Sequence, residues 1–187
     1  WLSKNGDEPF QLTNNLKNSS YNPKWSPDGK WISFVSNRDD KNQLHVIRVA
    51  GGEAFQITNS KTGISNYEWS PDGSQIAFTQ SEDKSDIDEK RKKKYGSYAV
   101  DDEEYKLQQL YVMDFDETEL NRKLNPQQLE DSAFKASQKP TLLMDSVNFT
   151  IGNFKWSPDG QKIAFNHQPD PLINSFFKSD ISIYDFN

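Results

Sequence analysis

Hydrophobic and polar residues alternate in three short stretches that resemble one another: KWISF (30–34), SQIAF (74–78) and QKIAF (161–165). Residues two positions apart in an extended strand lie on one face, so an isoleucine and a phenylalanine share a face in each stretch. The same five residues, WSPDG, precede every stretch and begin at Trp25, Trp69 and Trp156. Pro-Asp-Gly supplies a fixed φ, a side chain that bonds its own backbone and a residue that accepts positive φ. The pattern therefore predicts three hairpins, each with a turn at Pro-Asp-Gly.

Two further strands follow in each repeat. The third strand is predicted at LHVIRV (44–49), LYVMDF (110–115) and ISIYDF (181–186), and the fourth at AFQIT (54–58), with counterparts at PFQLT (9–13) and TLLMD (141–145). The third strands carry apolar residues on both faces, as expected for a strand that lies between neighbouring sheets. Four short antiparallel strands in a unit of about 40–45 residues are typical of a β-propeller blade. The predicted fold is all-β: a β-propeller of four-stranded antiparallel blades, with only part of the ring in this chain.

The repeat spacing predicts how the chain is divided. Residues 1–187 form a partial propeller, and its predicted parts are a blade end (1–13), a blade (22–58), a blade (66–145) and an incomplete blade (153–187). Trp25 and Trp69 are 44 residues apart, whereas Trp69 and Trp156 are 87 apart, and two loop insertions at 82–106 and 116–140 account for the difference. Consecutive connections of an up-and-down sheet leave at opposite ends, so the second insertion should lie at the end of the Pro-Asp-Gly turns. Closed propellers usually have four to eight blades, so the chain is expected to be a piece of a longer protein.

The composition excludes several classes of function. The 187 residues carry a net charge of −6, which argues against nucleic-acid binding because most of that affinity comes from neutralising phosphates. The chain has no cysteine, so a disulfide framework, a thiolate zinc site and a cysteine nucleophile are ruled out. No apolar run approaches the roughly 20 residues of a membrane-spanning helix, so we expect no membrane partner. The chain begins at Trp1 without signal-peptide features, so we expect any such segment to have been removed or never included.

Three carboxylates and two histidines are the first candidates for chemistry. The carboxylates Asp28, Asp72 and Asp159 are at equivalent positions of the turns, where calcium binding is conceivable. Equivalent turns of different blades are expected to lie far apart, so turn formation is the favoured interpretation and no metal or cofactor is expected. His45 falls within a predicted strand and His167 just beyond one. With no Gly-x-Ser-x-Gly elbow and no glycine-rich phosphate loop in the chain, no catalytic residue is predicted.

The first insertion is the most highly charged segment. Its basic run, residues 90–94, is flanked by acids and is expected to form a solvated face with ion pairs. The acidic cluster of residues 101–104 is followed by Tyr105. Neighbouring carboxylates can bind a substrate ammonium group, which makes Glu103 and Glu104 the candidate substrate-binding residues. A solvated acidic loop is the alternative interpretation.

The three WSPDG repeats resemble the propeller repeats shared by TolB and the prolyl oligopeptidase family of serine peptidases. The segment from Ser85 to Asp114, which ends in the strand LYVMD (110–114), is similar to a propeller segment of acylaminoacyl-peptidase-like and dipeptidyl-peptidase-like members of that family. The resemblance implies a propeller that sits over an α/β-hydrolase domain and restricts entry to short or unstructured peptides. The hydrolase domain would carry the catalytic serine, aspartate and histidine, none of which is in this chain. A role for Glu103 and Glu104 in anchoring the substrate N-terminus is implied by analogy alone.

These observations give one leading hypothesis and two alternatives. The leading hypothesis is the non-catalytic propeller region of a secreted or periplasmic serine exopeptidase or oligopeptidase. Its partners would be peptide substrates and the α/β-hydrolase domain of the same parent chain. The first alternative is a TolB-like propeller that acts as a protein-interaction scaffold. The second is a lyase or glycosidase that acts at the central channel and needs two nearby carboxylates, for which the sequence nominates no pair.

Overall fold

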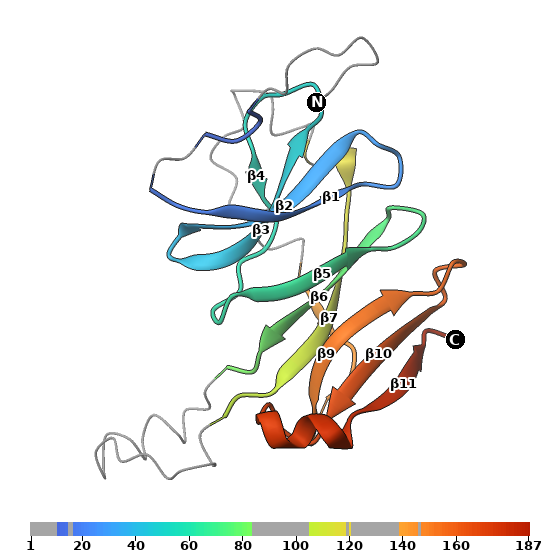
Figure 1. The fold of residues 1–187 in the computed structure, drawn as a ribbon. Helices are drawn as coiled ribbons and strands as arrows, with labels where there is room; N and C mark the ends of the chain where they lie inside the picture. The colour runs from blue at the N-terminus through green and yellow to red at the C-terminus, as the bar shows by residue number, and fades with distance from the viewer. Residues whose placement is uncertain (1–10, 15–16, 84–104, 119, 121–138, 146) are drawn as a thin grey trace, which may run out of the picture.

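In the computed structural model, the described residues are 11–14, 17–83, 105–118, 120, 139–145 and 147–187. Their strands form three separate antiparallel sheets, which follow one another down the view of Figure 1 from the blue N-terminal strands to the red C-terminal ones. Two of the sheets have four strands, joined in the order of the sequence. The prediction of an all-β fold built from four-stranded antiparallel blades is confirmed.

The strand bounds of each sheet are as follows. The first sheet contains β1 (Ser20–Trp25), β2 (Trp31–Asp39), β3 (Lys41–Arg48) and β4 (Phe55–Gln56). The second contains β5 (Ile64–Trp69), β6 (Gln75–Ser81), β7 (Gln108–Asp114) and β8 (Thr141–Leu142). The third contains β9 (Thr150–Trp156), β10 (Lys162–Gln168) and β11 (Asp180–Asp185), with the 3₁₀ helix η2 (Ile173–Lys178) between β10 and β11. Trp25, Trp69 and Trp156 thus each lie on the first strand of a different sheet.

The Pro-Asp-Gly turns are closed by the same side-chain hydrogen bonds in all three sheets. In the first turn, Ser26 Oγ donates to Asp28 Oδ1 at 2.6 Å, and the backbone N–H of Lys30 donates to the same oxygen at 3.1 Å. The hydrogen bond from Ser26 holds the pKa of Asp28 below its usual value. The second and third turns repeat the serine–aspartate bond with Ser70 and Asp72 and with Ser157 and Asp159.

Neighbouring turns contact each other, so the expectation that equivalent turns lie far apart is wrong. A Cβ atom placed on Gly73 would stand 3.3 Å from Cδ of Pro27, and one on Gly160 would stand 3.6 Å from Cδ of Pro71. The proline of one turn therefore packs against the glycine of the next. The reason is the small separation of stacked sheets, about 10 Å face to face. Even so, each aspartate is engaged within its own turn, as turn formation requires.

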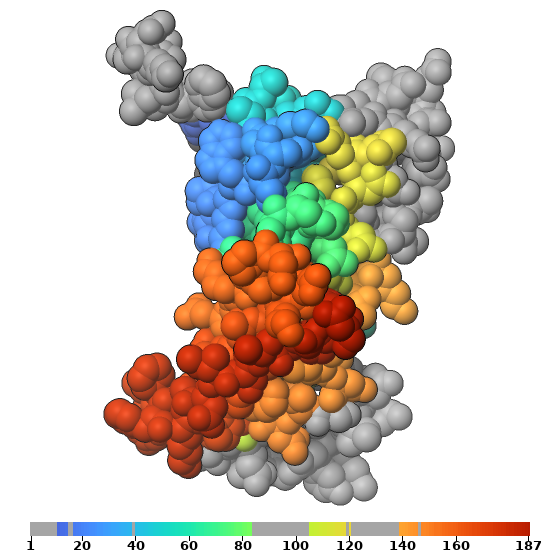
Figure 2. All heavy atoms as spheres, turned by 90° about the vertical axis from the view of Figure 1, so that its right-hand side faces the viewer, coloured from blue at the N-terminus to red at the C-terminus, as the bar shows by residue number. Residues whose placement is uncertain are grey.

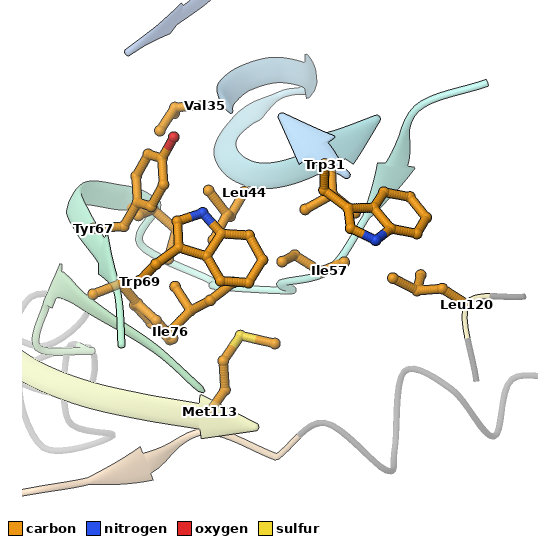
Figure 3. Packing of buried hydrophobic residues seen from close by; sticks show 12 residues of the cluster. Trp31, Val35, Leu44, Ile57, Tyr67, Trp69, Ile76, Met113 and Leu120 are labelled. Carbon is orange, nitrogen blue, oxygen red and sulfur yellow. The ribbon is translucent and has the colours of Figure 1, made fainter. Parts of the chain in front are cut away.

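The core lies between successive sheets. Figure 3 shows the indole of Trp69, from the second sheet, beside Leu44 and Ile57 of the first and Met113 of its own sheet. A second cluster joins the second sheet to the third: Leu110 and Val112 belong to the same buried group as Ile151 and Phe154. Polar atoms also cross the first interface, because Trp69 Nε1 donates a 2.8 Å hydrogen bond to Ser33 Oγ.

The third strand of the last sheet differs from its counterparts. Leu44 on β3 and Leu110 on β7 are at most 1% exposed, whereas Ile181 on β11 is 80% exposed. The described chain ends with this strand, so the prediction that residues 181–186 lie between neighbouring sheets stays a prediction. β11 is an outer strand of the third sheet, and no described sheet covers its far face.

The two predicted insertions begin and end at opposite ends of the second sheet. Ser81 pairs with Gln108 at one end, and Gln75 pairs with Asp114 at the end of the Pro-Asp-Gly turn. Most of 82–106 and of 116–140 lies outside the described residues, as does most of the predicted blade end 1–13.

The contact between neighbouring turns predicts a difference between two glycines. Gly29 and Gly73 have similar φ angles of 71° and 75°, so an alanine at either position meets about 1–2 kcal/mol of backbone strain. Among the described residues, no atom lies within 4 Å of a Cβ on Gly29, whereas Pro27 crowds one on Gly73. We expect Gly73→Ala to lower the free energy of unfolding in urea by more than Gly29→Ala does. Equal losses would show that a methyl group on Gly73 does not crowd Pro27.

Candidate functional site

The candidate residues of the first insertion cannot be placed. Glu103 and Glu104, the predicted substrate-binding residues, and the basic run 90–94 lie outside the described residues. The following residue, Tyr105, is described and is 41% exposed. The binding of a substrate ammonium group by these glutamates stays a prediction.

The two histidines take part in packing within the sheets. His45 is buried on β3, its ring stacks on Phe34 with centroids 5.5 Å apart, and Nδ1 lies 3.1 Å from the carbonyl oxygen of Gln43. His167 Nε2 lies 2.9 Å from Ser182 Oγ, and its ring lies against Phe149. Among the described residues, no carboxylate bonds to the imidazole of His167, so this serine–histidine pair does not make a triad.

Three charged residues connect the first strands of the three sheets. Lys24, Glu68 and Lys155 each immediately precede the tryptophan of a WSPDG motif, on β1, β5 and β9 respectively. Lys24 Nζ lies 2.8 Å from Glu68 Oε1, and Lys155 Nζ contacts the same oxygen. We call these three residues the charge ladder. Because β1, β5 and β9 are edge strands of their sheets, the ladder runs along one common edge of the stack.

The electrostatics of the ladder centre on Glu68. Its side chain is 16% exposed, and burial alone would raise the pKa of this carboxyl group. Burial is the largest single influence, but the hydrogen bonds and positive charges of Lys155 and Lys24 together outweigh it and hold the pKa of Glu68 below its usual value. Lys24 Nζ also donates a 2.6 Å hydrogen bond to the carbonyl oxygen of Tyr67 and lies 5.0 Å from the centroid of that ring. One carboxylate thus lies between two ammonium groups, which leaves this edge with an excess positive charge.

Sequence reasoning missed the ladder, although the signal was present. The residue before each motif tryptophan is lysine, then glutamate, then lysine. The alternation of charge has meaning only when the strands are known to be neighbours.

A groove lies between the first and second sheets, at the end opposite the Pro-Asp-Gly turn. It has a volume of about 480 Å³, and its lining includes the loop of residues 56–62, Phe78, Gln80 and Tyr111. Phe78 and Tyr111 stack with their ring centroids 5.7 Å apart. The loop is held from behind by the buried side chain of Gln43, whose Nε2 donates to the carbonyl oxygen of Ser60 at 2.7 Å. The groove is therefore formed by a fixed loop and an aromatic pair.

The base of the first insertion is closed by hydrogen bonds beside this groove. The N–H of Glu82 donates to the carbonyl oxygen of Leu107 at 2.9 Å, and Gln108 Nε2 donates to Ser81 Oγ at 2.7 Å. Whatever conformation residues 84–104 adopt, their two attachment points are held together.

Two kinds of feature are absent from the described part of the chain. It contains no helix long and apolar enough to cross a membrane. It also contains no group of three or more histidine, cysteine, aspartate or glutamate side chains placed to hold a metal ion.

The ladder predicts a pH-dependent contribution to stability. We expect Glu68→Gln to lower the free energy of unfolding at neutral pH by about 1–3 kcal/mol, because Lys24 and Lys155 lose a charged partner. The pKa of Glu68 is lower in the folded chain than in the unfolded one, so its stabilisation is present above about pH 4.3 and is lost as the pH falls through the folded-state pKa. Urea unfolding at several pH values measures the difference between the two proteins, which should shrink in acid.

A matched control is the exposed ion pair between Lys61 and Asp83, whose side chains are 83% and 56% exposed. Asp83→Asn should change stability by less than about 0.5 kcal/mol. A Glu68→Gln effect that is equally small, or that is the same at all pH values, would contradict the role given to the ladder.

Comparison with known proteins agrees with the repeat and the fold. Residues 4–111 match the family model for the dipeptidyl peptidase IV (DPP IV) N-terminal region. The uncharacterized peptidase YuxL of Bacillus subtilis is 43% identical over 47 residues, which are 25% of this chain and 7% of that protein. TolB from Acinetobacter baumannii is structurally similar with a TM-score of 0.57 and 18% identity, over 98% of this chain and 34% of that chain. The acylaminoacyl peptidase of Pyrococcus horikoshii gives a TM-score of 0.51 and 16% identity, over 89% of this chain and 23% of that chain.

The two solved structures establish a shared fold, and the chain spans only about a third or less of each. The resemblance to the propeller portion of prolyl oligopeptidase family peptidases, inferred from the WSPDG repeats, is confirmed. The family match extends over more than half of the residues and over the whole of the first sheet. The chain belongs to the dipeptidyl peptidase IV N-terminal region family.

Proposed function

We propose that this chain is the non-catalytic propeller region of a serine exopeptidase or oligopeptidase. In this role it restricts and orients peptide substrates for an α/β-hydrolase domain of the same parent chain. The observation that carries the proposal is the match of residues 4–111 to the N-terminal region of dipeptidyl peptidase IV. The relation to the peptidase YuxL supports it.

The contacts between sheets suit a gate that selects by size. A gate excludes folded proteins only if its blades keep their spacing, and three kinds of contact maintain that spacing here. They are the packing of Pro27 on Gly73, the hydrogen bond from Trp69 to Ser33, and the salt bridge from Lys24 to Glu68. An extended peptide is narrow enough to pass an opening that a folded domain cannot enter.

The charge ladder could orient peptide substrates as they enter. The first strand of a propeller blade faces the central channel, so the ladder edge is the proposed channel wall. Excess positive charge on this wall would attract the carboxylate of a peptide and orient it as it enters. Glu103 and Glu104, in the first insertion, are proposed to bind the opposite, amino-terminal end of the peptide.

The alternative function is a TolB-like scaffold that binds a protein partner. The structural likeness to TolB over 98% of this chain favours it. The gene sequence that follows Asn187 distinguishes the two proposals. A Gly-x-Ser-x-Gly segment in a hydrolase domain supports the peptidase, whereas further blades and then a stop codon support the scaffold. We also propose a periplasmic or secreted location, which cell fractionation of the source organism tests.

The first expected result is that the isolated chain has no peptidase activity. We expect no hydrolysis of aminoacyl or dipeptidyl p-nitroanilides by the purified 187-residue chain. A serine peptidase needs a nucleophile, a base and an oxyanion site, and the proposal assigns all three to the hydrolase domain. The parent protein, assayed under the same conditions, is the positive control. Turnover by the chain alone would contradict the proposal.

The role of the acidic cluster is tested in the parent protein. The double substitution Glu103→Gln and Glu104→Gln should raise KM for substrates with a free N-terminus by about ten- to a hundredfold, since charged hydrogen bonds contribute about 1.5–3 kcal/mol. N-acetylated substrates carry no ammonium group and should be unaffected. The matched control, Asp101→Asn with Asp102→Asn, should change KM little. An equal effect on both classes of substrate would exclude amine anchoring.

A further inference from the structure

The groove between the first and second sheets belongs to an interface that is complete within this chain. Each of these sheets has all four of its strands. Their atoms, blue to cyan for the first sheet and green to yellow for the second, pack directly against each other in Figure 2, so no further blade can enter the space between them. The volume of about 480 Å³ falls within the roughly 300–1,000 Å³ of pockets that bind small molecules.

One wall of the groove is held in place by a buried amide. Gln43 is 3% exposed, and its side-chain oxygen accepts hydrogen bonds from Thr58 Oγ1 and from the N–H of Ser60, both at 2.9 Å. Farther along the same loop, Thr62 Oγ1 donates a 2.6 Å hydrogen bond to the carbonyl oxygen of Ser81 on β6. The loop is thereby fixed to both sheets, and the groove is formed before any ligand binds.

Two stacked aromatic rings supply the apolar part of the lining. Tyr111 is partly exposed and lies nearly parallel to the buried ring of Phe78, with the two planes 11° apart. The hydroxyl group of Tyr111 donates a 3.0 Å hydrogen bond to Gln109 Oε1, which fixes the orientation of the ring. An aromatic side chain of a ligand can extend this stack, since such pairs form at centroid distances of about 4.5–7 Å.

Two polar groups of the lining have no partner among the described residues. The side-chain amide of Gln80 makes no hydrogen bond there, and the ammonium group of Lys139 makes no ion pair. The other lysine of the lining, Lys61, lies 3.1 Å from Asp83, so the net positive charge of the groove belongs to Lys139. An amide can both donate to and accept from a peptide group, and an ammonium group attracts a carboxylate.

We propose that this groove binds the carboxyl-terminal end of a peptide whose last side chain is aromatic. The aromatic side chain stacks on Tyr111, the last peptide group bonds to the amide of Gln80, and the terminal carboxylate pairs with Lys139. The last residue of such a peptide thus offers one group to each of these three features. The proposal rests on the geometry and charge of the groove and is independent of the proposed peptidase function.

Binding is tested with two acetylated dipeptides and the full 187-residue chain. N-acetyl-Gly-Phe has a free carboxylate, N-acetyl-Gly-Phe-amide has none, and neither carries the ammonium group that Glu103 and Glu104 are proposed to bind. In amide NMR spectra we expect the free acid to shift the signals of residues 57–62 and of Tyr111. It should bind about tenfold more tightly than the amide, because only the acid forms a charge-assisted hydrogen bond with Lys139.

Three outcomes of this comparison overturn the proposal. They are an equal affinity for the acid and the amide, signal shifts confined to residues outside the groove, and no binding of the acid at millimolar concentration.

Substitutions in the groove test the two polar contacts separately. Lys139→Gln should weaken binding of the acid about tenfold and leave binding of the amide unchanged. Gln80→Leu should weaken binding of both dipeptides about fivefold, since both present the same peptide groups. The matched control, Lys178→Gln, removes an exposed lysine from η2 and should change neither affinity.

The melting temperature of each variant shows whether the fold is retained. We expect it to be unchanged in all three, because in the described part of the chain these side chains hold no other residue in place. A loss in Lys139→Gln no larger than in Lys178→Gln overturns the carboxylate contact. Unchanged affinities in Gln80→Leu overturn the contact with the peptide group.

Discussion

The rest of the structure depends on the contacts that Trp69 and Trp156 make with the preceding sheets. A single four-stranded sheet cannot bury its faces by itself, and the blades of a repeat protein become stable only when neighbours cover them. At the first interface, Trp69 fills this role: it belongs to one buried cluster with Leu44 and Val46 of the preceding sheet, and its indole N–H bonds to Ser33 of that sheet. Because the indole nitrogen has a partner across the interface, the contact fixes the register of one sheet against the next as well as burying apolar area.

Other contacts between the sheets follow from the way in which the tryptophan positions one sheet on the next. Once the sheets are stacked, residues at one position of the repeat become neighbours. The turn proline meets the next turn's glycine, and the residue before one tryptophan meets the residue before the next. Interactions along the stack are therefore between nearest neighbours, and their sign depends on the identity of residues at a single repeat position. Lysine, glutamate and lysine give attraction at both steps, whereas three lysines would give repulsion.

Local structure was predictable from sequence, and relations between sheets were not. The turns, the strand alternation and the four-strand unit depend on residues close together in the chain, such as Ser26 and Asp28 within one turn. The ladder, the contact of Pro27 with Gly73 and the groove depend on how one sheet sits on the next, which spacing alone does not specify. The burial predicted for residues 181–186 likewise depends on a neighbouring sheet, and it stays a prediction. Apolar residues on both faces of a strand indicate that the strand can pack between two sheets. They do not show that both sheets are present.

The difference between contacts within a sheet and contacts between sheets also explains where a functional loop can be added to such a scaffold. Sheets held by nearest-neighbour contacts tolerate long insertions if the two ends of each insertion stay fixed. At the base of residues 82–106, the hydrogen bonds of Glu82 and Gln108 provide that fixation next to the groove and away from the Pro-Asp-Gly turn. A loop anchored in this way can vary in sequence, and so in what it recognises, without disturbing the tryptophan contacts. A propeller that gates substrates needs both properties: blades that keep their spacing and loops that differ from one relative to another.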